Sequence, residues 1–404
     1  MAKPQHDLSD LAGEENKSLL NRDFIFTVLS VFIFFFNFHI FILLPIYIKK
    51  LGGTESDVGF IMGAANFSTL FTTPAVGILV DRWGKKSLLA CGGLVMAIST
   101  VPFAYLNTLN FFLFTFLRIV HGAAFSLCFI AAGTLTADVT PASKRSQAIG
   151  LFGVFALVNY AFAPFVGRRI IENYDFHILF LSVFMFGFLS FLAALPINEP
   201  EKIQKSGAGK NKKGNIITTL FRRGVFIAAF TLMISGYGFI PTLTFIPVFA
   251  KQIKIESFDL FFIACTLSAL FIRVLGGWIP DRFGKKKAAI PSLLLFAISI
   301  VGISFASNTS HFIETGILFG LSHGLVYPSI YALVIDLCSI FERGRAFAIC
   351  SFAFNLGGTL GSFIYGVIAE HLGFQIMFQS AGLVCFFGFL VFTIFGKGSR
   401  GVVV

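Results

Sequence analysis

Two arginines and three histidines stand inside long apolar runs, where a charge is costly. Arg118, His121, His39, His323 and Arg273 lie away from the ends of these runs. An arginine in such a setting requires an anionic partner or water. Histidine is the side chain that gains or loses a proton most easily near neutral pH. Because no Asp or Glu lies at a comparable depth, these five residues are the candidates for binding an anion or carrying a proton through an apolar medium.

Arg118 and His121 are three positions apart, so they share one face of a helix. The charge of Arg118 then opposes protonation of His121 until water or a substrate anion screens the pair. We interpret the two as one unit that couples protonation to binding. Structural alternatives stay open: Arg118 bonds backbone carbonyls, Arg273 reaches toward the membrane edge, and each histidine is a satisfied hydrogen-bonding group. Further polar residues in these runs either line a cavity or bond neighbouring helices; they are Asn37, Asn66, Asn159, Tyr327 and Asn355.

The sequence carries neither a phosphate-binding loop nor a zinc-protease motif. The segment ending at Gly84 and Lys85 resembles a phosphate-binding loop, but Leu79 occupies a place that requires Gly. The pattern H-E-x-x-H does not occur, and the six cysteines form no CxxC pair. We therefore expect no catalytic residue, no cofactor and no metal. Without an ATP site, uphill movement of a solute must draw on a gradient of protons or another ion.

The composition indicates the elements that position these residues. Charged residues make up 13% of the chain and hydrophobic residues 56%, whereas soluble domains carry about a quarter charged residues. Lipid must therefore be the solvent for most of the surface, and the 55 Phe are interpreted mainly as lipid-facing side chains. The net charge of +11 comes from short loops between apolar runs, a pattern typical of membrane topology and not of nucleic-acid binding.

Twelve runs are long enough to cross a bilayer, which takes roughly 20 apolar residues in a helix. Uniform hydrophobicity along these runs excludes the alternating strands of a β-barrel. The sequence therefore predicts an all-α membrane protein with twelve transmembrane helices. The predicted spans are 24–48, 57–80, 87–106, 110–137, 148–171, 176–197, 224–249, 257–280, 288–307, 311–337, 345–369 and 374–396.

Lys and Arg concentrate on one side of these spans. The N-terminal tail, the loops after even-numbered spans and the C-terminus hold most of the 31 basic residues. This bias predicts that both termini are cytoplasmic. The few basic residues in the opposite loops are Lys49, Lys50, Arg168, Arg169, Lys251 and Lys254.

The longest loop divides the chain into two halves. Residues 198–223 are rich in Gly, Lys and Asn, which predicts a flexible cytoplasmic linker. The linker separates a half at 24–197 from a half at 224–396, with cytoplasmic tails at 1–23 and 397–404.

The two halves repeat short motifs. The segment GILVDRWGKK begins at Gly77, and GWIPDRFGKK begins at Gly277, 200 positions later. A His-Gly pair also recurs, at His121 and at His323. A duplicated six-helix unit places the working site between its copies near the middle of the membrane.

With these motifs the chain resembles the major facilitator superfamily of transporters over roughly residues 24–396. The signature of that family, G-x-L-x-D-R-x-G-R/K-K/R between its second and third helices, is matched at every fixed place from Gly77 to Lys86, and more weakly in the second copy. The resemblance implies that this loop latches against the eleventh helix. The latch residues are Gly77, Asp81, Arg82, Gly84 and Lys85, with Asp281, Arg282 and Gly284 in the second copy.

The residue types suit such a latch. Gly84 can supply a tight turn that other residues resist, and Gly77 can let a neighbouring helix approach closely. Asp81 at a membrane edge needs a partner, for which Arg82 and Lys85 are candidates. An ordinary solvated basic turn remains the alternative.

Two other family motifs are present in altered form. Arg118 and the residues after it resemble the fourth-helix motif R-x-x-Q-G, with His121 in place of Gln. Pro164 and Gly167 match an antiporter motif of the fifth helix, while Asn159 and Arg168 depart from it. A simple proline kink explains the same residues.

The resemblance implies a secondary transporter in a bacterial inner membrane, with a small molecule and the lipid bilayer as partners and no obligate protein partner. We expect proton-coupled export of a small amphipathic or hydrophobic molecule. The alternative is proton-coupled or facilitated uptake of a polar metabolite or organic anion, with Arg118 and Arg273 as counter-charges. A membrane receptor or a lipid-modifying enzyme without transport activity is the remaining alternative.

Overall fold

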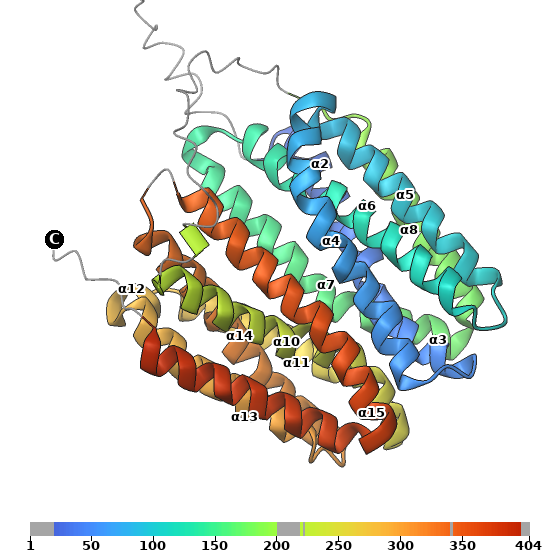
Figure 1. Cartoon of the computed structure of the whole chain (residues 1–404). Helices are drawn as coiled ribbons and strands as arrows, with labels where there is room; N and C mark the ends of the chain where they lie inside the picture. Colours follow the sequence, from blue (N-terminus) through green and yellow to red (C-terminus); the bar gives the residue numbers. More distant parts are fainter. Residues whose placement is uncertain (1–19, 200–218, 221–222, 340–341, 397–404) are drawn as a thin grey trace, which may run out of the picture.

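The computed structural model describes residues 20–199, 219–220, 223–339 and 342–396, and the described part is helical throughout with turns between (Figure 1). Most of the expected linker at 198–223 and of both tails lies outside the described residues. The helices run side by side in two groups, one from each half of the chain (Figure 1). The fold is an all-α membrane protein of twelve spans in two six-helix halves.

The N-terminal half holds six spans. The first is one long helix with a 3-10 turn in the middle, where α2 (Arg22–His39), η1 (Ile40–Leu43) and α3 (Leu44–Lys50) follow each other without a break. A short 3-10 turn, η2 (Ala142–Lys144), precedes the fifth span. The other spans are α4 (Glu55–Trp83), α5 (Lys85–Tyr105), α6 (Phe111–Asp138), α7 (Arg145–Asn173) and α8 (Phe176–Ala194).

The C-terminal half also holds six spans, three of them irregular. The eighth span is broken into α11 (Asp259–Leu275) and α12 (Ile279–Phe283). The last two spans form α15 (Arg343–Phe395), which bends sharply at Gly373, where φ is 83°. The regular spans are α10 (Arg223–Gln252), α13 (Lys285–Ile303) and α14 (Thr309–Leu337).

The loop repeat adopts the same turn in both halves. Gly84 has φ 83° between α4 and α5, and Gly284 has φ 94° between α12 and α13. This left-handed region is open to glycine and strained for other residues. The expectation that Gly84 supplies a tight turn is confirmed.

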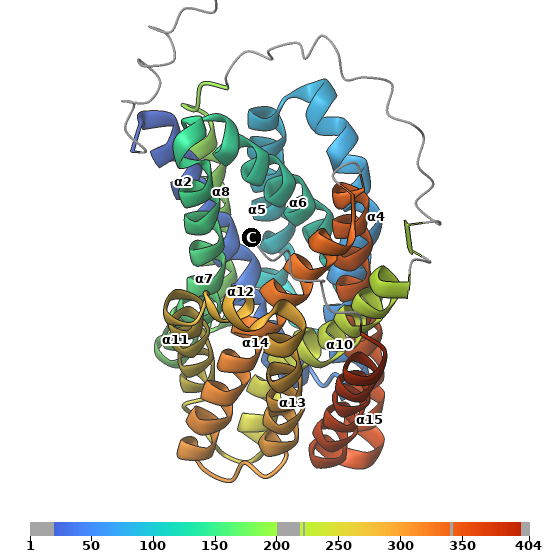
Figure 2. The same cartoon turned by 90° about the vertical axis from the view of Figure 1, so that its left-hand side faces the viewer.

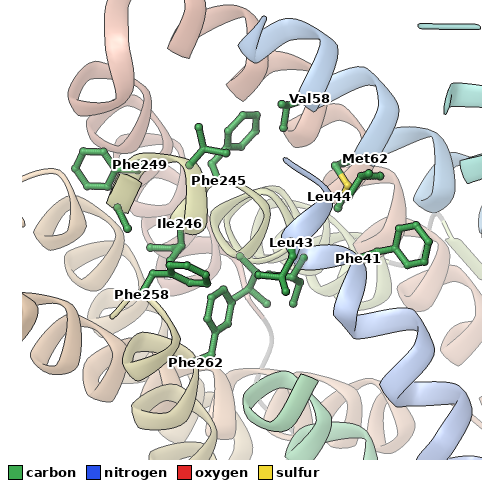
Figure 3. Close-up of a cluster of buried hydrophobic side chains, with 14 of the residues drawn as sticks. Phe41, Leu43, Leu44, Val58, Met62, Phe245, Ile246, Phe249, Phe258 and Phe262 are labelled. Carbon is green, nitrogen blue, oxygen red and sulfur yellow. The ribbon is translucent and has the colours of Figure 1, made fainter. Parts of the chain in front are cut away.

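The two ends of the bundle differ in how the halves meet. We call the end with the Gly84 and Gly284 turns the basic end, and the other end, which includes the loop from Lys49 to Thr54, the far end. One hydrophobic core at the far end contains residues of both halves, which we call the inter-half core. Figure 3 shows it: Phe41, Leu43 and Leu44 come from the N-terminal half, and Phe245, Phe249, Phe258 and Phe262 from the C-terminal half.

At the basic end the cores are separate. One cluster draws only on the N-terminal half, from Phe24 to Ile197, and the other only on the C-terminal half, from Val225 to Phe392. Among the described residues, each half thus has its own interior at the basic end, and the interior that both halves share lies toward the far end.

Two pairs of helices join the halves along their sides, α4 with α15 and α7 with α11 (Figure 2). Glycines bring α4 and α15 together at the far end. A Cβ added at Gly59 would lie 2.4 Å from the carbonyl oxygen of Ser362, and one at Gly366 would lie 2.7 Å from the carbonyl oxygen of Glu55. Only the lack of a side chain lets these backbones approach so closely.

Candidate functional site

A buried polar network occupies the N-terminal half. Arg118 Nη1 donates to His121 Nδ1 at 2.9 Å, and His121 Nε2 lies 3.0 Å from Asn37 Oδ1. Asn37 Nδ2 in turn donates to the Val183 carbonyl at 2.8 Å. An arginine can only donate, so His121 Nδ1 accepts and Nε2 carries the ring proton. The network fixes one neutral tautomer of His121 and connects α2, α6 and α8.

This network is enclosed by its own half. Arg118 is 2% exposed and His121 0%. The Arg118 guanidinium lies 4.8 Å from the ring centroid of Phe41 and 5.9 Å from that of Phe38. The expectation that Arg118 and His121 contact each other is confirmed, while their role in coupling a proton to transport stays a prediction.

Asn159 and Asn355 bond backbone groups. Asn159 is fully buried and donates to the Phe155 carbonyl at 2.8 Å and to the Phe32 carbonyl at 3.2 Å, so it ties α7 to α2. Asn355 donates to the Ser351 carbonyl at 2.9 Å within its own helix. In these contacts Asn159 acts as an interhelical hydrogen-bonding group, the alternative given above for such residues.

A row of rings crosses from one half to the other at mid-depth, and we call it the interface aromatic row. His39 in α2 lies 4.0 Å from Tyr160 in α7, centroid to centroid, and Tyr160 lies 5.9 Å from Phe239 in α10. Phe239 stacks on His323 in α14 at 3.7 Å, and His323 lies 6.0 Å from Tyr327. The row therefore links two of the predicted histidines through residues of both halves.

Arg273 lies beside this row. It lies within electrostatic range of Tyr160 and Tyr327, which belong to different halves, and of His323. Its Nε is buried without a hydrogen-bond partner. Arg273 and three members of the row are partly accessible, namely Tyr160, His323 and Tyr327. Arg118 and His121 are buried. Both arginines lie inside apolar runs of the sequence, but in the structure only Arg273 is partly accessible.

An ion pair between the halves lies at the far end. Arg168 of α7 pairs with Asp259 of α11, and Arg168 Nε also bonds Glu172 Oε1 at 2.6 Å. The Asp259 side chain is 3% exposed and that of Arg168 14%. Sequence reasoning missed this pair. The available signal was Arg168 itself, a basic residue near the side of the membrane that the topology otherwise keeps poor in positive charge.

A second polar contact joins the halves nearby. Glu370 of α15 accepts a hydrogen bond from the Ser56 backbone N–H at 3.2 Å, in the first turn of α4. A carboxylate is favourable at a helix N-terminus because the N–H groups there lack partners. A cavity of about 480 Å³ adjoins this contact, lined from both halves by Lys49, Glu55 and Lys251 among others.

The loop motif makes its described contacts within its own half. Lys85 Nζ pairs with Asp138, and in the second copy Lys285 Nζ pairs with Asp336 at 2.5 Å. Glu199 accepts hydrogen bonds from the backbone N–H groups of Lys85 at 2.9 Å and Lys86 at 3.0 Å. The latch role of the loop stays a prediction.

The other latch residues differ in their surroundings. The side chain of Asp81 lies outside the described part, while Arg82 and Asp281 are exposed. Arg282 stacks over the ring of Trp278 at 5.5 Å. The expectation of a close helix approach at Gly77 is wrong in this structure, since a Cβ there would meet none of the described residues within 4 Å.

Comparisons with known proteins agree with this architecture. A family model described as Major Facilitator Superfamily matches residues 26–282 and 256–401. The chain is similar to the multi-drug resistance efflux pump PmrA of Streptococcus pneumoniae, with 24% identity over 86% of this chain and 89% of the relative. It is also similar to the staphylopine export protein of Staphylococcus aureus, with 22% identity over 88% of this chain and 91% of the relative.

Among solved structures, a D-xylose–proton symporter superposes with a TM-score of 0.78 at 16% identity, covering 94% of this chain and 99% of the other. At that identity the likeness concerns the fold alone. The family match spans nearly the whole chain, including both copies of the loop motif. The chain therefore belongs to the Major Facilitator Superfamily.

Proposed function

We propose that the protein is a secondary transporter that exports a small amphipathic molecule in exchange for protons. The observation that carries this proposal is the contrast between one inter-half core at the far end and two separate cores at the basic end. Alternating access requires two states, each closed at one end of the bundle and open at the other. Halves that meet only at the far end correspond to one of these states.

The distribution of basic residues assigns the two ends. If the basic end faces the cytoplasm, as the positive-inside rule predicts, the far end faces outward and is closed. The structure then corresponds to the state that exchanges its solute with the cytoplasm. Export as the direction is supported by the two relatives named as an efflux pump and an export protein.

Proton coupling is assigned to the interface aromatic row. His39 and His323 lie in a row that crosses the halves, whereas His121 is locked as a neutral ring inside one half. A proton that drives rocking must change the interaction between the halves. His39 and His323 are better placed for that than His121.

Export can be tested in bacterial cells that lack their own efflux pumps. The cells are loaded with neutral, cationic or anionic amphipathic fluorescent dyes, and dye loss is followed with and without a protonophore. Expression of the protein is expected to speed the loss of at least one dye, and the protonophore to abolish the difference. Accumulation of a dye against its gradient would instead support the uptake alternative, and no effect on any dye would contradict the proposal.

A further inference from the structure

We propose that Arg273 forms the binding subsite for an acidic group of the substrate, so that the transported molecule is an aromatic or amphipathic organic anion. The inference rests on the proposed function, because it assigns the substrate class of the same inter-half site. It depends on the charge state, the neighbours and the accessibility of Arg273.

Arg273 has no counter-charge in the described part of the chain. No carboxylate in the described part forms an ion pair with Arg273, and its Nε has no hydrogen-bond acceptor there. A charged group held at mid-depth in a membrane protein is costly unless an anion or water compensates it. A carboxylate or sulfonate from the substrate would supply the missing charge and accept two parallel hydrogen bonds from the guanidinium.

The neighbours of Arg273 suit an acidic group attached to an apolar body. Tyr160 of one half and Tyr327 of the other lie within electrostatic range of Arg273, and both belong to the interface aromatic row. The rings of Phe239 and His323 stack on each other at 3.7 Å and supply apolar packing next to these groups. Binding pockets for small molecules combine such apolar walls with a few fixed polar groups. A bound anion would therefore contact both halves at once.

Arg118 shares the unpartnered Nε and has no carboxylate partner in the described part, but it lacks the accessibility of Arg273. Its guanidinium bonds His121 and packs against phenyl rings inside the N-terminal half, at 2% exposure. The described acidic residues lie at or near helix ends, for example Asp259 and Asp336. The mid-depth site therefore presents a positive charge without a matching negative one, which favours an anion and disfavours an amine.

The test compares pairs of ligands that differ only in the acidic group. Purified full-length protein is titrated with 1-pyrenebutanoate and with its neutral alcohol, 1-pyrenebutanol, together with a small panel of other aromatic carboxylates and their alcohols. Binding is measured by ligand fluorescence and by the increase in thermal stability, since a ligand that binds only the folded state stabilises it. We expect at least one carboxylate to bind about tenfold or more tightly than its alcohol, a difference of one decade in affinity.

Variants assign this preference to Arg273. Arg273→Gln is expected to remove the preference for the carboxylate while leaving alcohol binding unchanged. Arg273→Lys keeps the charge but cannot form the bidentate hydrogen bonds of a guanidinium, so its preference for the carboxylate should be intermediate. Arg343→Gln is the matched control, because Arg343 is exposed at the start of α15, and it should behave as the wild type. Size-exclusion profiles and unfolding temperatures establish that each variant is folded.

The outcomes separate the inference from the proposed function. Equal affinity for carboxylates and alcohols across the panel, or an unchanged preference in Arg273→Gln, would overturn the inference, even if neutral dyes are exported. The opposite result is also informative. If the protein prefers carboxylates through Arg273 but moves no solute in the cell assay, the subsite is supported and export is refuted.

Discussion

The two ends of the molecule hold their charges in different ways. At the far end, the Arg168–Asp259 pair and the Glu370–Ser56 contact join one half to the other. At the basic end, the Lys85–Asp138 and Lys285–Asp336 pairs each stay within one half. The rocking that we propose must therefore break the contacts between the halves and keep those within each half. Contacts within a half make it a rigid body, and only contacts between halves decide which end is closed.

The tight glycine contact at the far end is expected to give the largest effect. Gly59→Val places a side chain against the backbone at Ser362, where even a Cβ would lie at 2.4 Å. A backbone cannot yield as a flexible side chain does, so α4 and α15 should separate and transport should fall to background. Gly150→Val in α7 is the matched control, because a Cβ there meets nothing within 4 Å. Equal transport by the two variants would show that this contact is not part of the closed state.

Loss of the ion pair between the halves should come next. Asp259→Asn removes a charge-assisted hydrogen bond worth about 1.5–3 kcal/mol, which corresponds to a shift of roughly tenfold to a hundredfold toward the state open at the far end. Thiol labelling of a cysteine placed at Phe258 in the inter-half core measures the shift. The exchanged pair Arg168→Asp with Asp259→Arg should restore part of the protection. Full labelling in that exchanged pair would argue that Asp259 acts through some other contact.

Glu370→Gln is expected to have a smaller effect of the same sign. A carboxylate at an exposed helix N-terminus contributes about 0.3–1 kcal/mol, so labelling at the far end should rise only a few-fold. Glu256→Gln is the control at the same end, because Glu256 pairs with Lys251 within its own half. If Glu256→Gln opens the far end as much as Glu370→Gln, general surface charge is responsible.

The smallest effect is expected at the basic end. Asp336→Asn breaks a partly exposed pair within one half, and such pairs contribute about 0–1 kcal/mol. It should lower the unfolding temperature slightly and leave the balance between the two open states unchanged. A clear change in far-end labelling would contradict the assignment of this pair to a rigid body.

The sequence predicts the spans well because a membrane helix requires a long apolar run. The ends are less accurate, because helices continue into charged turns: α5 begins at Lys85 and α10 ends at Gln252. The break between α11 and α12 was not expected. It spans Gly276 to Trp278, and glycine weakens a helix. Pro280 stands in the first turn of α12, where proline is tolerated.

Contacts within one helix could be predicted, and contacts between halves could not. Arg118 and His121 share a helix face by their spacing alone. Arg168 and Asp259 are brought together by the docking of α7 on α11, which no spacing encodes. The same reason explains why a close approach was expected at Gly77 and is found at Gly59.

The most direct test of alternating access measures both ends of one molecule. Spin labels are attached to exposed positions in a variant without native cysteines, at Trp83 and Phe283 for the basic end and at Tyr174 and Glu256 for the far end. Distances within each pair are measured by pulsed electron resonance, before and after Asp259→Asn. The account predicts that the far-end distance lengthens while the basic-end distance shortens. A far end that opens with no change at the basic end would contradict the rocking of two rigid halves.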